Sequence, residues 1–218
     1  SVPEKGVNPL ESLARFILGL CDVEHPVDEV LGASSVAPTL LATDQESANV
    51  VPGEVWQTLD WRTVPGQQDE EVRRRLEEIL AASLADGADG EVTVPVYTRR
   101  TYTGRTMEIP GSNPPYALAD DHPAVVAAGG ILTEIVGGEA ATPGIWKFAT
   151  DGGHFAEAGM APVGIGPGDE FLAHTNVEQI EIEALDVALD INRALAERLG
   201  LRAAELGFEA ERPESSRP

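Results

Sequence analysis

The sequence predicts a mixed α/β (α+β) protein, and two observations support this class. Between residues 9 and 98, helical and strand patterns of apolar residues follow one another in the order helix, strand, strand, helix, strand. Between residues 145 and 165, two short apolar runs have glycine-rich loops at their ends, which is typical of strands that present a ligand site in an α/β sheet. The chain of 218 residues is long enough for one domain or two small ones.

The first predicted helix extends from Pro9 to about Leu20. Asn8 is a suitable N-cap, and proline is favoured at the first helical position. We expect Cys21, near the end of this helix, to be a small buried side chain, and residues 23–34 to form a loop. Apolar residues at i, i+3 and i+4 spacing predict the buried face of the helix: Leu10, Leu13, Ala14, Ile17 and Leu18.

Two predicted strands follow, at Ser35–Thr43 and Val55–Arg62. A turn rich in Pro and Gly, residues 49–54, leads into the second strand. In that strand two sets of residues alternate, which predicts that they face opposite sides of the sheet: Val55, Gln57, Leu59 and Trp61 against Trp56, Thr58 and Asp60.

The second predicted helix begins at Asp69, which we expect to be its N-cap, and the Asp86–Gly87 turn ends it. Residues 91–98 then have the composition of a third strand. This order of elements is that of a ferredoxin-like βαββαβ unit without its first strand. The residues expected to face inward on the helix are Val72, Leu76, Ile79 and Leu80.

The second half begins with a Thr-, Gly- and Pro-rich connection and a helix at 124–136, with Pro123 in its first turn. Short strands are expected near 145–149 and 162–165, and a long amphipathic helix at 180–199. The predicted buried side of the long helix contains Ile182, Leu185, Ala188, Leu189 and Leu195. The expected division of the chain is a first domain at 1–98, a crossover at 99–120, a second segment at 121–208 and a frayed tail at 209–218.

Charge and composition limit the function. Fifteen basic against 37 acidic residues give a net charge of −22, which argues against nucleic acid or an anionic membrane as a partner. No run approaches the ~20 apolar residues needed to span a bilayer. The single cysteine cannot form an internal disulfide, so a reducing, cytoplasmic setting is expected. The acidic, lysine-poor composition suits a salt-rich cytoplasm, and a GC-rich genome is the alternative reason for the preference for arginine.

One block resembles a known family. Residues 146–178 contain a Thr-Asp-Gly-Gly turn at 150–153, a Gly166-Pro167-Gly168 loop, His174, and Glu178 four positions later. This pattern resembles the C-terminal signature of the di-zinc peptidase family M20, which includes aminoacylases and acetylornithine deacetylases. The first nine residues resemble the middle of another motif of this family. The resemblance implies that residues 1–98 form the lid, or dimerisation, domain, and that residues 121–208 are the C-terminal portion of a zinc-peptidase-like α/β catalytic domain.

The resemblance assigns roles to residues of the second half. His174 would be a zinc ligand, and Glu178 either orients it or belongs to the start of the last helix. Thr150 belongs to the turn that contacts substrate in relatives, although Gly153 stands where those relatives have an arginine. The backbone N–H groups of Gly166 and Gly168 would line the substrate pocket, and the alternative is that they are flexible loop glycines.

Asn49 and Arg62 form a second candidate site. They are thirteen positions apart, as in the N-V-x-P…(D/N)-x-R pattern with which relatives hold a substrate carboxylate across a dimer. Arginine offers a planar fork for bidentate carboxylate binding, and asparagine adds a neutral donor. The alternative is that Arg62 pairs with Asp60 or Glu54, and that Asn49 only stabilises its turn.

The resemblance implies part of a metal-dependent amidohydrolase or peptidase that cleaves the amide bond of an N-acyl amino acid or small peptide. Two zinc ions per intact site are expected, with cobalt or manganese as alternatives, and the chain would form a homodimer through the lid. No catalytic residue is expected in this chain, because the general-base Glu and the other metal ligands of the family fall upstream of Ser1. A non-catalytic dimerisation or binding module, and a subunit complemented by another chain, are the competing interpretations.

Overall fold

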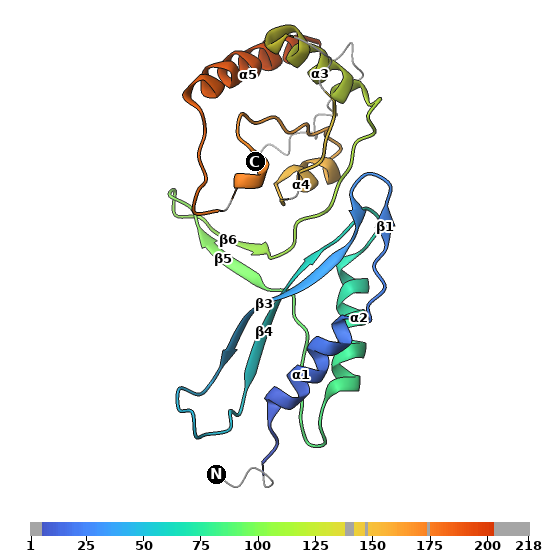
Figure 1. Cartoon of the computed structure of the whole chain (residues 1–218), viewed down its shortest axis with the longest axis vertical. Helices are drawn as coiled ribbons and strands as arrows, with labels where there is room; N and C mark the ends of the chain where they lie inside the picture. The colour runs from blue at the N-terminus through green and yellow to red at the C-terminus, as the bar shows by residue number, and fades with distance from the viewer. Residues whose placement is uncertain (1–5, 138–141, 147, 174, 203–218) are drawn as a thin grey trace, which may run out of the picture. The chain divides into compact units, whose positions relative to one another are not determined.

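The computed structural model describes residues 6–137, 142–146, 148–173 and 175–202. Contacts within the chain separate two compact units, with the boundary between Pro115 and Tyr116. Figure 1 labels their helices and strands. The first unit contains α1 (Pro9–Leu20), β1 (Val27–Asp28), β2 (Gly32–Ala33), β3 (Ser35–Thr43), β4 (Val55–Arg62), α2 (Asp69–Ser83), β5 (Val96–Arg100) and β6 (Thr106–Pro110). The second contains α3 (Pro123–Val136), α4 (Gly152–Glu157), a 3₁₀ helix (Glu170–Leu172) and α5 (Ile182–Arg202).

Helix α1 has the predicted bounds, but its predicted buried face is only partly right, because Leu13 packs against the core and Ala14 is exposed. Asn8 Oδ1 accepts a hydrogen bond from Leu10 N at 3.1 Å, which caps the helix as expected. The buried row is Ser12, Phe16 and Leu20, whereas Leu18 is 68% exposed. This row contains the only aromatic side chain of the helix, and the Ser12 hydroxyl accepts a hydrogen bond from the Ala85 N–H at 3.0 Å, beyond the end of α2.

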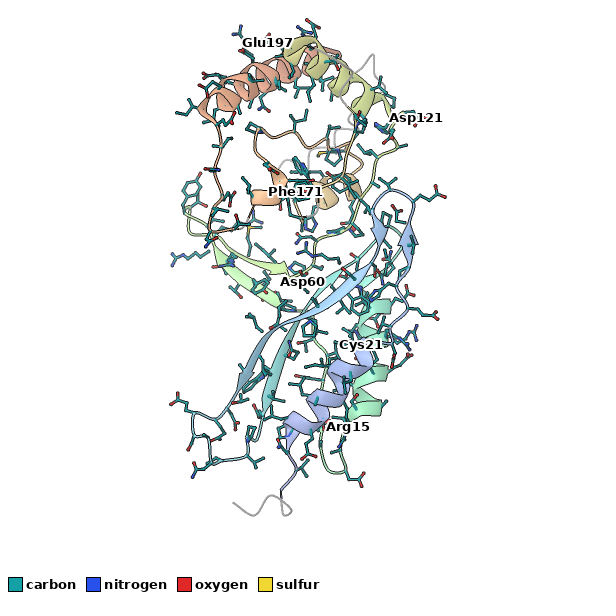
Figure 2. All side chains as sticks on the ribbon, viewed as in Figure 1. Arg15, Cys21, Asp60, Asp121, Phe171 and Glu197 are labelled. Carbon is teal, nitrogen blue, oxygen red and sulfur yellow. The ribbon has the colours of Figure 1, made fainter. Side chains whose placement is uncertain are left out.

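The prediction that Cys21 is buried was also wrong. Cys21 is exposed and follows the last residue of α1 (Figure 2). Its sulfur lies 3.9 Å from Ile17 O, four residues earlier in the chain. The apolar residue that ends the buried row is therefore Leu20, one position before the cysteine.

Strands β3 and β4 form an antiparallel pair, with Ser35 opposite Arg62 and Thr43 opposite Val55. The alternation predicted for β4 is confirmed, because exposed and half-buried side chains alternate along the whole strand. Leu59 and Trp61 pack against the core formed by Phe16, Leu20 and Leu76, so α1 and α2 cover one face of the pair. We call the other face, which includes Trp56, Thr58, Asp60 and Arg62, the open face of the sheet.

The N-cap of helix α2 lies one residue before the predicted one. Gln68 is the N-cap residue, and Asp69 is the first helical residue. Three acidic side chains in the first turn, Asp69, Glu70 and Glu71, interact favourably with the positive end of the helix dipole. The expected inward residues are confirmed: Leu76 is buried, and Val72, Ile79 and Leu80 pack against the core.

The third strand predicted at 91–98 is largely wrong. Residues 91–95 form no strand, and residues 96–98 belong to β5, which pairs with β6 and not with β4. Val92 still packs against the core. Among the described strands, β4 pairs only with β3, so residues 91–95 have no further strand of this sheet with which to form hydrogen bonds. The described core of the unit is therefore a helix, two paired strands and a second helix, in that order. The predicted loop at 23–34 contains the short β1–β2 pair.

The second unit is built on α3 and α5, which contact each other (Figure 1). Their buried residues are small or branched: Ala124, Ala128 and Ile131 on α3, and Ala188 and Ile191 on α5. The predicted buried side of α5 was right for Ala188 and wrong for Ile182, Leu185 and Leu189, which are 74, 47 and 67% exposed. The helix also begins two residues later than expected.

The two strands predicted at 145–149 and 162–165 are absent among the residues described there. An apolar run becomes a strand only when another backbone pairs with it, and the described part of the second unit contains no strand. The runs nevertheless contact each other, because a Cβ built on Gly164 would lie 2.4 Å from the Trp146 ring. In the described residues we find no helix long and apolar enough to cross a membrane.

Candidate functional site

Arg62 lies at the end of β4 on the open face of the sheet. Its Nε and Nη2 donate to the same oxygen, Asp60 Oδ2, at 3.0 and 2.8 Å. Figure 2 shows Asp60 on this strand. Residues i and i+2 of a strand share a face, which explains the pair. The side chains of Arg62 and Asp60 are 49 and 46% exposed, so a ligand from solvent has access to the guanidinium.

Asn49 lies in the connection between β3 and β4, at the opposite end of this strand pair. The Ser47 hydroxyl donates to Asn49 Oδ1 within the turn. An eight-residue strand such as β4 spans roughly 23 Å, so Asn49 and Arg62 of one copy lie too far apart to hold one small carboxylate. The structure therefore does not bring the two predicted carboxylate ligands together within a single chain.

Thr150 stabilises the turn that begins α4. Its hydroxyl accepts a hydrogen bond from Gly152 N at 3.1 Å. A Cβ on Gly152 would lie 2.5 Å from the Tyr116 ring, so the ring packs directly on the backbone at this position. Gly152 and Gly153 are both buried. The contacts made by Thr150 in this structure are thus those of a turn residue, while its predicted role toward substrate remains a prediction.

A cavity of about 320 Å³ lies between the loop at Gly166 and helix α5. Gly166 is among its lining residues, and the exposed Gly168 is not. Sequence reasoning did not find this cavity, although the apolar residues of α5 that line it recur at helical spacing. The full lining is Ile165, Gly166, Pro167, Glu181, Glu183, Ala184, Val187, Ala188 and Ile191.

The predicted zinc ligand, His174, lies outside the described residues. Glu178 is exposed, and its backbone N–H donates to Thr175 O at 3.3 Å. The described histidines have other positions: His25 contacts Ser34 and Trp61, His122 caps α3, and His154 is exposed on α4. Within the described ranges, no three His, Cys, Asp or Glu side chains gather as a metal site would require. These residues alone therefore do not fit a di-zinc centre.

Comparison with known proteins identifies the first unit. Residues 1–88 match the peptidase dimerisation domain of the M20 family. This match spans α1, β3, β4 and α2, which are the elements built around the Phe16 core. No curated protein matches the chain. At residues 1–88, the chain therefore contains an M20 peptidase dimerisation domain.

Proposed function

We propose that this chain is the dimerisation and substrate-binding part of a metal-dependent amidohydrolase that cleaves the amide bond of an N-acyl amino acid or small peptide. The observation that supports this function best is the dimerisation domain at residues 1–88, with Arg62 held on its open face. The domain joins two copies of the chain, and each copy supplies an arginine for the carboxylate that such substrates possess.

Arg62 is the residue suited to that carboxylate. Its guanidinium already binds one oxygen of Asp60, and a substrate carboxylate would replace or share this partner. Because Asn49 is remote from Arg62 within one copy, we propose that the two residues make separate contacts with substrate and do not bind the same carboxylate together. In the second unit, the candidate substrate contact is Gly166, which lines the cavity beside α5.

The only zinc ligand that we propose in this chain is His174. A catalytic zinc ion would supply a Lewis acid and an activated water. His174, with Glu178 near it in sequence, would be this chain's contribution to the ligand set, and the other ligands and the general base would come from residues outside the described part. We therefore expect no hydrolysis of N-acetyl amino acids by the chain alone with added zinc, and hydrolysis under these conditions would contradict this assignment.

A second function, a dimerisation module without catalysis, has one observation in its favour. The family match covers the dimerisation domain at residues 1–88. The native mass from sedimentation equilibrium, together with the zinc content per chain, separates the two functions. A dimer with near-stoichiometric zinc and additional polypeptide supports the hydrolase, and a dimer of this chain alone with little zinc supports the module.

The carboxylate role of Arg62 has a direct test that needs no activity. N-acetyl amino acids are titrated into the chain and binding is followed by NMR chemical shifts. A hydrogen bond to a charged group contributes about 1.5–3 kcal/mol, so Arg62→Ala should weaken binding roughly 10- to 100-fold, and Arg62→Lys should restore part of it.

Arg74→Ala is the matched control, because Arg74 is also exposed and paired with a carboxylate, Glu78, at 2.6 Å. This control should leave the affinity unchanged. Equal binding by the Arg62→Ala variant and the wild-type chain would remove Arg62 from the proposed site.

A further inference from the structure

The hairpin formed by β5 and β6, residues 96–110, is basic in a strongly acidic protein. It contains Arg99, Arg100 and Arg105 and one acidic residue, Glu108, in a chain of net charge −22. We call it the basic hairpin. None of its arginines forms an ion pair with the residues that the structure describes, whereas the other arginines with described side chains all do: Arg15, Arg62, Arg73, Arg74, Arg75, Arg193 and Arg198.

Apolar and aromatic side chains lie beside these charges. Tyr97 is opposite Ile109, and Arg99 is opposite Met107, so these four residues share one face of the hairpin. Tyr97 is 49% exposed, and Met107 and Ile109 are each 41% exposed. The Arg99 guanidinium lies 5.8 Å from the centre of the Tyr97 ring. At the turn, the Tyr102 side chain is completely exposed.

Among the residues that the structure describes, none covers the strands of the basic hairpin. Every residue of both strands is exposed. Hydrogen bonds hold the turn, from Thr101 N to Arg105 O at 2.8 Å and from Gly104 N to Thr101 O at 2.9 Å. An isolated two-stranded hairpin is only marginally stable in water, so a surface that covers one face would stabilise it. Arginine, tyrosine and methionine are also the residues enriched where protein interfaces bury their centre.

We propose that the basic hairpin docks on an acidic surface of a second copy of this chain. Charge complementarity favours this partner, because each copy has 37 acidic against 15 basic residues and thus offers carboxylates in excess. Arginine forks bind carboxylates with two parallel hydrogen bonds. The dimerisation domain, which we propose holds the second copy, lies in the same unit as the basic hairpin. The inference rests on the homodimer proposed above.

In a twofold dimer the contact is reciprocal, so each copy contributes one basic hairpin and one acidic surface. The arginines then offset part of the repulsion between two chains of net charge −22. Exposed tyrosine and methionine side chains between the charges supply the apolar area that an ionic contact alone lacks.

The test is the dissociation constant of the full chain, measured by sedimentation equilibrium. The variant Arg99→Gln/Arg105→Gln removes two positive charges from the basic hairpin, and we expect self-association to weaken roughly tenfold or more. The matched control, Arg75→Gln/Arg193→Gln, removes the same charge from two helices and should change the constant less than about threefold. Far-UV circular dichroism of both variants should match the wild-type chain.

Three results would overturn the inference in distinguishable ways. If the wild-type chain dimerises and the basic-hairpin variant dissociates no more than the control, the hairpin does not contact the second copy. If the dissociation constant is unchanged, but sedimentation velocity shows that the variant sediments more slowly than wild type in the same association state, the hairpin docks within its own chain. If the wild-type chain is a monomer, the proposed homodimer fails and this inference fails with it.

Discussion

The two units of this chain differ in how far local pattern determines their structure. In the first unit, two helices cover one face of a hairpin, and a core forms around Phe16, Leu20 and Leu76. In the second, α3 and α5 contact each other, and their buried residues are alanines and isoleucines. The apolar runs near Trp146 and Ile165 remain without strand partners among the described residues. A hairpin finds its partner strand a few residues away, whereas a single apolar run depends on a partner from elsewhere in the fold.

The largest expected effect is on the core of the first unit. Phe16→Ala removes a side chain that is 7% exposed and packs where both helices meet β4, so we expect a loss of about 3–5 kcal/mol in the free energy of unfolding. Urea unfolding followed by far-UV circular dichroism measures it. If the units unfold separately, only the transition of the first unit should move.

Leu18→Ala is the control for this prediction, because Leu18 is on the same helix and 68% exposed. We expect a change below about 1 kcal/mol. A larger loss for Leu18→Ala than for Phe16→Ala would mean that the face first predicted from the sequence, and not the Ser12–Phe16–Leu20 row, is the buried one.

A smaller effect is expected in the second unit from Gly164→Ala. The added methyl group would lie 2.4 Å from the Trp146 ring, which must move, and such overpacking costs about 1–3 kcal/mol. Trp146 is the tryptophan of the second unit, so its fluorescence in a Trp56→Phe/Trp61→Phe background reports the change. Gly166→Ala is the matched control, because its nearest neighbouring atom is 4.0 Å away. Equal stability of both variants would show that the contact between the two apolar runs is not tight.

The sequence was sufficient for the elements that form from near neighbours. The bounds of α1, β3 and β4 were predicted, as was the alternation along β4. The buried face of α1 was predicted only for Leu13, because the position of α2 decides which row of the helix is fully buried. Ser12 belongs to the buried row although it is polar, since its hydroxyl accepts the Ala85 N–H.

The candidate site was predicted in the same uneven way. The Arg62–Asp60 pair was one of two alternatives, since residues two apart on a strand share a face. The separation of Asn49 from Arg62 depends on strand register, which a motif spacing does not contain. The cavity beside Gly166 was not predicted, because its lining comes from two segments, the loop and α5, whose contact the sequence does not reveal. Glu181 and Glu183, which also line it, resemble ordinary exposed residues in the sequence.

The smallest expected effect concerns the ion pair between α3 and α5. The two terminal nitrogens of Arg198 donate hydrogen bonds to Glu134, Nη1 to Oε2 at 2.5 Å and Nη2 to Oε1 at 3.0 Å. The hydrogen bonds from Arg198, and then its charge, lower the pKa of Glu134 below its ordinary value. The two side chains are 44 and 63% exposed, so solvent and salt screen the pair and Glu134→Gln should lower the melting temperature only slightly at pH 7.

The pH dependence of the difference in melting temperature between the wild-type chain and the Glu134→Gln variant shows whether the ionised pair causes it. A carboxyl group whose pKa is lowered by folding adds stability that is fully present above its unfolded pKa, about 4.3, and that disappears as the pH falls through the lower folded value. The melting temperatures of the wild-type chain and the Glu134→Gln variant should therefore differ at pH 7 and converge as the pH falls below about 4. Glu11→Gln is the control, because Glu11 forms an exposed ion pair with Arg15 within a single helix, α1. A difference for Glu134→Gln that persists unchanged at pH 3 would show that the ionised pair does not stabilise the contact between α3 and α5.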